Sequence, residues 1–162
     1  MRILSLFASF LLLITLTGCG GSDTETSNST TDTATETVSE VTIKPVGNQM
    51  KYEQTEFTVE AGTEVSLTFD NVATSPAMKH NVVILNSEDD EVVQRVGNAA
   101  LQAADSGYIP DDNAIIAATD MADPGQTVNT TFTAPSEPGT YTYICTFPGH
   151  FMMMQGTMTV VA

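Results

Sequence analysis

Apolar side chains recur at every second position over much of residues 41–162, which is the pattern of strands with one buried face. The clearest run places Val65, Leu67 and Phe69 between polar neighbours. Similar runs lie at 55–60, 141–145 and 158–162. Residues 81–85 are instead apolar in succession after the first, as in a strand buried on both faces. The pattern predicts an all-β domain, a sandwich or a barrel.

One segment departs from this period and predicts a helix over residues 87–104. Its apolar positions recur at helical spacing, at Val92, Val93, Val96, Ala100 and Ala103. Four acidic residues at 88–91 stand near the start of this helix, where they complement the helix dipole. The same cluster is a candidate calcium site, although the alternation and the glycine of a calcium loop are missing. Gly97 lowers the helix propensity in the middle of the segment.

The N-terminus has the features of an export signal. Arg2 precedes a mostly apolar run over residues 3–16, and Thr17-Gly18-Cys19 then resembles the bacterial lipobox. That resemblance implies a lipoprotein signal peptide at 1–18 and a diacylglycerol thioether on Cys19. The alternative is an ordinary signal peptide followed by an incidental cysteine.

Residues 19–40 form a different kind of segment, consisting of the candidate lipidated Cys19 and a linker rich in Ser, Thr, Asp and Glu. So few apolar side chains cannot offset the entropy of ordering the linker, which predicts a flexible tether. A random coil of this length spans about 25 Å on average. The remaining residues, 41–162, are long enough for one hydrophobic core.

The charge balance narrows the range of partners. The chain of 162 residues has a net charge of −15. Nucleic acid and anionic lipid surfaces are bound by clustered Lys and Arg, so we expect neither to be a partner of this acidic protein. Residues 41–162 hold 4 basic and 15 acidic residues, a net charge of −11. Such a surface steers a basic partner, for example the basic face of a cytochrome.

Four residues predict a metal site: His80, Cys145, His150 and Met154. The chain has only two His, and its one other Cys is the candidate lipidation site. Phe147-Pro148-Gly149 forces a tight loop between Cys145 and His150. One thiolate, two imidazoles and a weak axial thioether are the ligands of a type 1 (blue) copper site. Such a mixed set, held by a stiff scaffold, suits both Cu(I) and Cu(II), so little has to move when the electron moves.

Other interpretations of these residues are less economical. A zinc site leaves the thioether unexplained, because zinc takes thiolate, imidazole and carboxylate. A Cys–His nucleophile pair lacks an orienting carboxylate in the loop. A satisfied core histidine together with a free thiol is the remaining alternative. Copper oxidases and nitrite reductases need additional copper sites with further His, so we expect no enzyme.

The stretch 141–150, followed by Met154 and Gly156, resembles the copper loop of azurin and auracyanin, blue copper proteins of the cupredoxin family. The resemblance extends upstream to residues 48–52, 78–81 and 107–110. It implies an eight-stranded Greek-key β-sandwich with one short helical flap, and single-electron transfer by one copper ion cycling between Cu(I) and Cu(II).

The resemblance also implies a role for each ligand. His80 and His150 would supply the imidazoles, Cys145 the thiolate and Met154 the axial thioether. The backbone carbonyl of Lys79 would be a weak axial ligand on the opposite side, although the family has Gly at this position.

By the same resemblance, three further residues of this chain would lie around the copper ligands. The backbone N–H groups of Asn81 and Phe147 would donate to the sulfur of Cys145, which tends to raise the potential. The side chains of Asn81 and Thr146 would brace the two ligand segments against each other.

An apolar patch around His150 is a candidate docking surface for redox partners. Its members would be Met50, Met78, Phe147, Pro148, Phe151, Met152 and Met153. The alternative for Met152 and Met153 is packing at the end of the sandwich.

The features together predict a monomeric electron carrier, lipid-anchored at the outer face of a bacterial membrane in the periplasm or another extracytoplasmic space. Its partners would be redox proteins such as a cytochrome or a membrane oxidoreductase complex. The alternative function is a copper carrier or buffer of the cell envelope, which would pass Cu(I) through Met152 and Met153. The closed ligand loop favours retention of copper over transfer.

Overall fold

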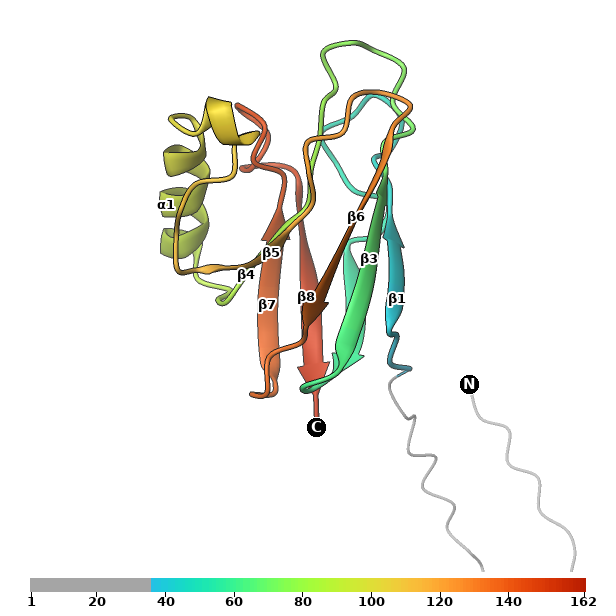
Figure 1. Ribbon diagram of the computed structural model, residues 1–162, viewed down its shortest axis with the longest axis vertical. Helices are drawn as coiled ribbons and strands as arrows, with labels where there is room; N and C mark the ends of the chain where they lie inside the picture. Colours follow the sequence, from blue (N-terminus) through green and yellow to red (C-terminus); the bar gives the residue numbers. More distant parts are fainter. Residues whose placement is uncertain (1–35) are drawn as a thin grey trace, which may run out of the picture. The chain divides into compact units, whose positions relative to one another are not determined.

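The computed structural model describes residues 36–162, and the predicted signal peptide, Cys19 and most of the linker lie outside this part of the chain. The described residues form eight strands, one α-helix and one 3-10 turn (Figure 1). The strands are β1 (Glu40–Ile43), β2 (Glu56–Glu60), β3 (Glu64–Asp70), β4 (Val83–Leu85), β5 (Ile115–Ala118), β6 (Thr127–Thr133), β7 (Gly139–Ile144) and β8 (Gln155–Val161). The helical elements are α1 (Asp90–Ala100) and η1 (Ala104–Ser106).

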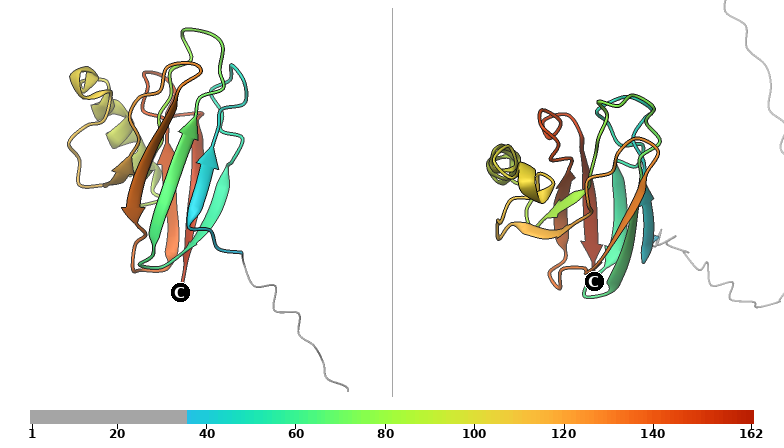
Figure 2. Two further views of the ribbon diagram at one scale, coloured as in Figure 1. Left: turned by 45° about the vertical axis from the view of Figure 1, so that its right-hand side comes forward. Right: turned by 45° about the horizontal axis from the view of Figure 1, so that its top comes forward.

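The strands pair into two sheets that face each other (Figure 2). One sheet has three strands in the order β1-β3-β6, and the other has five in the order β2-β8-β7-β4-β5. β1 runs parallel to β3 and β2 runs parallel to β8, while the remaining pairs are antiparallel. The structure confirms the predicted eight-stranded all-β sandwich with one short helix.

The burial of each strand follows the sequence pattern. In β3, Val65, Leu67 and Phe69 are fully buried while their polar neighbours face outward. β4 is buried at all three positions, because it lies between β7 and β5 and has α1 on one side. The continuous apolar run at 81–85 therefore contains the predicted central strand.

Two clusters of apolar side chains hold the domain together. The main cluster fills the space between the sheets and includes Tyr52, Phe69 and Tyr143. A second cluster lies beneath α1. Its buried members are Val83, Leu85, Val93, Val96, Ala114, Ile144 and Phe151. Alternate residues of β4 and β7 therefore belong to different clusters, as expected for a sheet covered on both faces.

The helix is shorter than the sequence predicts at both ends. It begins at Asp90 rather than residue 87, because Asp89 is extended and its backbone N–H donates to the Ser87 hydroxyl at 3.0 Å. It ends at Ala100, and the chain then tightens into η1. The acidic residues at 88–91 are exposed, which suits a solvated helix N-terminus.

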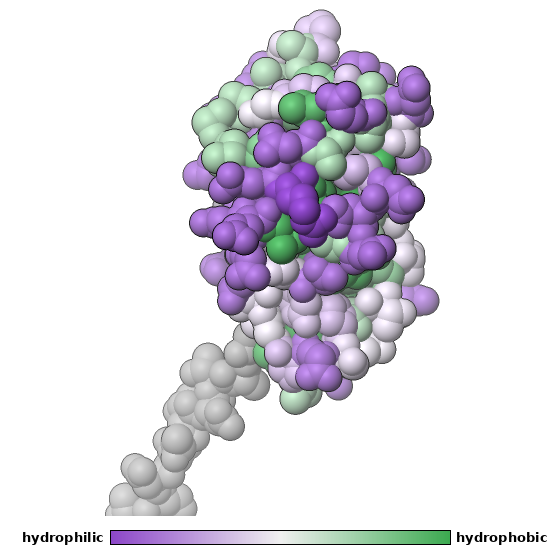
Figure 3. Space-filling view, turned by 90° about the vertical axis from the view of Figure 1, so that its left-hand side faces the viewer, coloured by the Kyte–Doolittle hydropathy of each residue, from purple (hydrophilic) through white to green (hydrophobic). Residues whose placement is uncertain are grey.

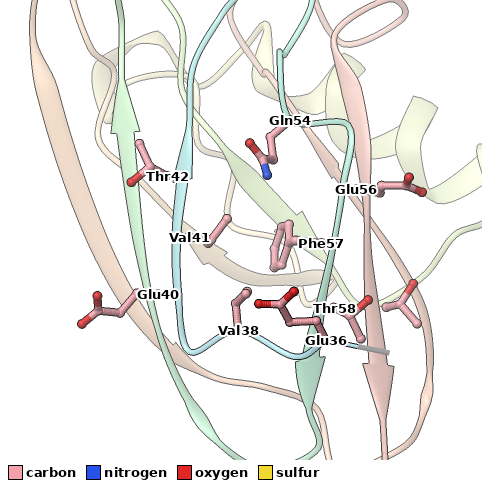
Figure 4. Close-up of a pocket in the computed structure, with 10 residues that line it drawn as sticks. Glu36, Val38, Glu40, Val41, Thr42, Gln54, Glu56, Phe57 and Thr58 are labelled. Atoms are coloured by element: carbon pink, nitrogen blue, oxygen red, sulfur yellow. The ribbon is translucent and has the colours of Figure 1, made fainter. Parts of the chain in front are cut away.

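The edge strands β1 and β2 leave a cavity of about 570 Å³ between the sheets (Figure 4). Phe57 and Val41 line it, as do the acidic residues Glu36, Glu40 and Glu56. None of the candidate metal ligands borders this cavity. Among the described residues, no helix has the length and apolar character needed to cross a membrane.

Candidate metal centre

His80 lies in a segment that the buried side chain of Asn71 holds in place. Backbone hydrogen bonds join His80 and Ala122 in both directions, at 3.2 and 2.8 Å. The Asn71 amide donates at 2.9 Å to the carbonyls of both Met78 and Ala122. His80 directly precedes the strand predicted at 81–85 and would stand at its start. It instead forms an isolated bridge, and β4 begins three residues later at Val83.

Cys145 and His150 come from the loop that follows β7. The His150 N–H donates to the Phe147 carbonyl at 3.0 Å, so the Phe-Pro-Gly segment closes a tight turn. The N–H groups of Met153 and Met154 then donate to the His150 carbonyl at 2.9 and 2.8 Å. The Cys145 N–H donates to the Met154 carbonyl at 3.0 Å, so the two ends of the loop lie side by side. In Figure 1 this loop lies at the upper end of the sandwich.

The structure brings one atom from each of three predicted ligands to a common point. The Sγ atom of Cys145 lies 3.7 Å from Nδ1 of His80 and 3.6 Å from Nδ1 of His150. The two Nδ1 atoms lie 3.1 Å apart. The point equidistant from the corners of this triangle is about 2.0 Å from each atom. Metal bonds to imidazole nitrogen and thiolate sulfur are about 2.0–2.3 Å long, so the three atoms fit one metal ion.

The three side chains that form this triangle are shielded from solvent. His80 is fully buried, Cys145 is fully buried and His150 is 4% exposed. The Nε2 atom of His80 has no hydrogen-bond partner within the described part of the chain. Met154 is also fully buried and belongs to the main cluster. Its carbonyl accepts from the Cys145 N–H, so the backbone of Met154 lies next to that of Cys145.

Burial sets the protonation states of the three groups in the metal-free protein. It raises the pKa of the Cys145 thiol to about 12, although backbone N–H groups of Asn81 and Phe147 that hydrogen-bond to the sulfur oppose the rise. Burial and the neighbouring His150 lower the pKa of His80 to about 4. Burial also lowers the pKa of His150. At neutral pH the site therefore holds a neutral thiol and two neutral imidazoles.

Hydrogen bonds between Asn81 and Thr146 connect the segment that carries His80 to the loop that carries Cys145. The Asn81 amide donates to the Thr146 hydroxyl, and the Thr146 N–H donates to the Asn81 carbonyl oxygen of the side chain, both at 2.8 Å. The Lys79 side chain forms an ion pair with Asp123 at 2.6 Å. That pair lies next to the His80–Ala122 bridge and joins residues 79–80 to residues 122–123 at the surface.

Sequence analysis missed the parts played by Tyr52 and Asn71. The Tyr52 hydroxyl donates to the Asn81 carbonyl at 2.6 Å, and its ring packs against those of Tyr143 and Phe69. Burial raises the pKa of Tyr52, so it remains a donor. Asn71 follows Asp70, and such a pair is locally typical of nothing more specific than a turn. The hydrogen bonds from Tyr52 to Asn81 and from Asn71 to Ala122 join segments distant in the sequence, so no local pattern reveals them.

The predicted docking patch is only partly at the surface. Met152 and Met153 are 60% and 58% exposed. Met50, Met78, Phe147 and Pro148 are half-buried. The prediction is wrong for Phe151, which is buried in the cluster beneath α1 and cannot contribute to a docking surface. Figure 3 shows the face that carries α1, with polar residues over its middle and hydrophobic ones more frequent towards the upper end.

A β-sandwich that holds a buried Cys–His–His triangle at one end, with a methionine beside it, defines a mononuclear copper-binding protein of the blue type. Residues 39–161 match the family described as copper binding proteins, plastocyanin/azurin family. The chain belongs to this family.

Individual relatives agree with this assignment. Auracyanin-A of Chloroflexus aurantiacus is 33% identical over 162 residues, which cover 99% of this chain and 96% of that protein. The crystal structure of dithionite-reduced auracyanin from Roseiflexus castenholzii superposes with a TM-score of 0.73 at 37% identity, covering 78% of this chain and all of that one. Outer membrane protein H.8 of Neisseria meningitidis is 36% identical over 106 residues, 63% of this chain and 56% of that protein.

The protein is therefore a type 1 copper electron-transfer protein with one copper ion. The copper ion supplies a one-electron couple between Cu(I) and Cu(II). The protein supplies a buried, closely packed site for the ion, and the protein exchanges electrons with other redox proteins.

Proposed function

We propose that His80, Cys145 and His150 bind the copper ion and that Met154 is its weak axial ligand. The observation that supports this assignment is the triangle of Sγ and two Nδ1 atoms, whose centre suits one metal ion. We also propose that the Lys79 carbonyl is the opposite axial contact.

The test is the visible spectrum of the full chain after addition of Cu²⁺. A strong blue band from thiolate-to-copper charge transfer is expected, and it should be absent from Cys145→Ser. Met154→Leu should retain the band with an altered reduction potential, because the axial ligand tunes the potential. A colourless copper complex of the unchanged chain would overturn the assignment.

The carrier is held at the outer face of a bacterial membrane by a lipid on Cys19, with residues 1–18 as its signal peptide and 19–40 as a tether to the copper domain. The lipobox-like sequence supports this proposal. So does the similarity to outer membrane protein H.8 of Neisseria meningitidis. In cells that express the chain, Cys19→Ala should move it from the membrane fraction to the soluble fraction. Retention of Cys19→Ala in the membrane would refute the lipid anchor.

The electron partners are a cytochrome or a membrane oxidoreductase complex, which the monomeric protein meets through the surface around His150. Exposed Met152 and Met153 support this proposal because they offer a soft apolar contact beside a ligand histidine. Met152→Lys should slow electron exchange with a cytochrome c and leave the blue band unchanged. We assign no enzymatic activity, because the two His of the chain leave none for a second copper site.

A copper carrier or buffer of the cell envelope is the second candidate, favoured by the same two exposed thioethers. Thioethers are soft ligands that select Cu(I). The closed loop around His150 opposes rapid release. Transfer of Cu(I) to a competing chelator distinguishes the two functions. A copper carrier should lose Cu(I) quickly, and the double variant Met152→Leu/Met153→Leu should lose it more slowly. An electron-transfer protein should retain its copper both in the unchanged chain and in the double variant.

A further inference from the structure

The helical segment from α1 to residue 108, which we call the flap, contacts the ligand loop on both sides of His150. One contact is made by Gly97, in the middle of α1. The ring of Phe151, the residue after His150, lies directly against the Cα atom of Gly97. A Cβ atom at position 97 would lie 2.7 Å from Cδ1 of this ring and still closer to Cγ and Cδ2. The glycine therefore creates the notch that Phe151 occupies.

The ring cannot avoid such a Cβ atom by turning in place. Cγ of Phe151 lies on the axis about which the ring rotates, so rotation of the ring leaves Cγ where it is. A different rotamer of Phe151, a shift of its backbone or a shift of α1 is needed to relieve the overlap. That backbone is fixed in turn, because the Gln155 amide donates to the Phe151 carbonyl at 2.8 Å. Because Phe151 directly follows His150, a displacement of the Phe151 backbone also moves the chain at His150.

The second contact is made at the other end of the flap by Tyr108. Its ring packs edge-on against that of Phe147, with 5.6 Å between the centroids, and Phe147 packs edge-on against His150 at 5.0 Å. Tyr108 has a φ of 63°, in the left-handed region that a bulky residue rarely adopts. Residues kept in such conformations are held there by their surroundings and often serve a functional site.

We propose that the flap positions the His150 imidazole, with Gly97 and Tyr108 as its two positioning residues. The Phe151 contact fixes the chain after His150, and the Phe147 contact fixes the ring of His150 from the side. The flap thereby preforms the ligand loop before copper arrives. This inference rests on the proposed role of His150 as a copper ligand.

The experiment compares the unchanged full chain with Gly97→Ala in the copper-free state, by amide hydrogen exchange resolved at single residues. The N–H groups of Met153 and Met154, which donate to the His150 carbonyl, should exchange at least about tenfold faster in Gly97→Ala. Amides of β3 should change by less than about twofold. When loaded with copper, Gly97→Ala should show a shifted charge-transfer band and a shifted reduction potential.

Gly139→Ala is the matched control, because a Cβ atom there meets only Tyr141 at an ordinary 3.7 Å. It should leave the exchange rates of the loop and the copper spectrum unchanged. In a Phe151→Ala background, Gly97→Ala should have no further effect, since the overlapping ring is gone. Loop exchange and spectrum both unchanged in Gly97→Ala would overturn the proposal.

Tyr108→Gly keeps the proposal testable where Gly97→Ala does not fold. Glycine relieves the left-handed backbone, so a purely structural role for Tyr108 predicts a loop that is equally protected or better protected. A positioning role predicts faster exchange at Met153 and Met154 and a shifted copper spectrum. Failure of the proposed function would appear separately, as the absence of a blue band from the unchanged chain.

Discussion

The buried side chain of Asn81 forms two hydrogen bonds with Thr146, 65 positions later in the chain: it donates to the Thr146 hydroxyl and accepts from the Thr146 backbone N–H, both at 2.8 Å. Each residue directly follows a candidate copper ligand, His80 and Cys145 respectively. The pair therefore fixes the distance between the two segments that contribute ligands. Neither hydrogen bond uses an atom of a candidate copper ligand.

We expect Asn81→Ala to lower the free energy of unfolding of the copper-free protein by about 1–3 kcal/mol, because the Thr146 N–H loses its acceptor in a buried position. Asn129→Ala is the control. The Asn129 side chain is also hydrogen-bonded to a threonine, accepting from the Thr68 hydroxyl at 2.8 Å, but at the surface, and its loss should cost less than about 0.5 kcal/mol. Urea unfolding measures both. Equal costs for the two variants would show that burial does not set the strength of the Asn81 contact.

The stability of the copper-free protein should fall as the pH is lowered from 6.5 to 4. The pKa of His80 is about 4 in the folded protein and 6.5 in its ordinary range. The unfolded chain therefore binds more protons than the folded one within this window, and protons favour unfolding. The contribution is fully present above pH 6.5 and is lost as the pH falls towards 4. The lowered pKa of His150 acts in the same direction.

Urea unfolding at several pH values between 4 and 7 measures this dependence. His80→Gln should reduce the slope of unfolding free energy against pH, leaving the part due to His150. A slope that is the same with and without His80 would contradict the lowered pKa.

The sequence predicted most of the sandwich because its strands alternate in polarity. β3 and the run around β4 are examples, where burial follows the pattern residue by residue. β1 and β5 were not predicted, because each has only four residues and its pairing partner lies far along the chain. A period of two is not measurable over so short a segment.

The candidate site was predictable where its residues are close in sequence and where residue types are scarce. Cys145, His150 and Met154 share one loop, and His80 is the only other histidine. The burial of Phe151 was not predictable, because it depends on a missing side chain at Gly97, 54 positions earlier. An apolar residue between a ligand and two exposed methionines has the same local pattern whether it faces solvent or a helix.

Metal binding at pH 7.5 should release about one proton per ion. The thiol of Cys145 has a pKa of about 12 in the metal-free protein, so it is neutral at this pH, yet the metal takes the thiolate. The two imidazoles already lack a proton, because both pKa values are lowered. Affinity should accordingly rise about tenfold per pH unit near neutrality.

Calorimetric titration with Zn²⁺, a redox-inactive probe that takes the same sulfur and nitrogen ligands, in buffers of different ionisation enthalpy counts these protons. Cys145→Ser should release about none. Release of none from the unchanged chain would mean that the thiolate exists before the metal binds.

Gly156→Ala should lower the free energy of unfolding by about 1–3 kcal/mol, the usual cost of overpacking. Gly156 of β8 lies opposite Tyr143 of β7, and the tyrosine ring covers the glycine so closely that an added Cβ atom would overlap Cζ and Oη. Displacing the ring also breaks the bond from the Tyr143 hydroxyl to the Gln54 carbonyl, which is 2.6 Å long.

Gly139→Ala adds the same methyl group to the same pair of strands, opposite Val160, but meets only an ordinary contact at 3.7 Å. It should stabilise the protein by about 0.4–1 kcal/mol, because alanine restricts the unfolded chain. Urea unfolding of both variants and of the pair Tyr143→Ala and Tyr143→Ala/Gly156→Ala separates the causes. If the tyrosine ring is responsible, the penalty at position 156 disappears once the ring is removed; a penalty that persists without the ring would place its origin in the β8 backbone instead.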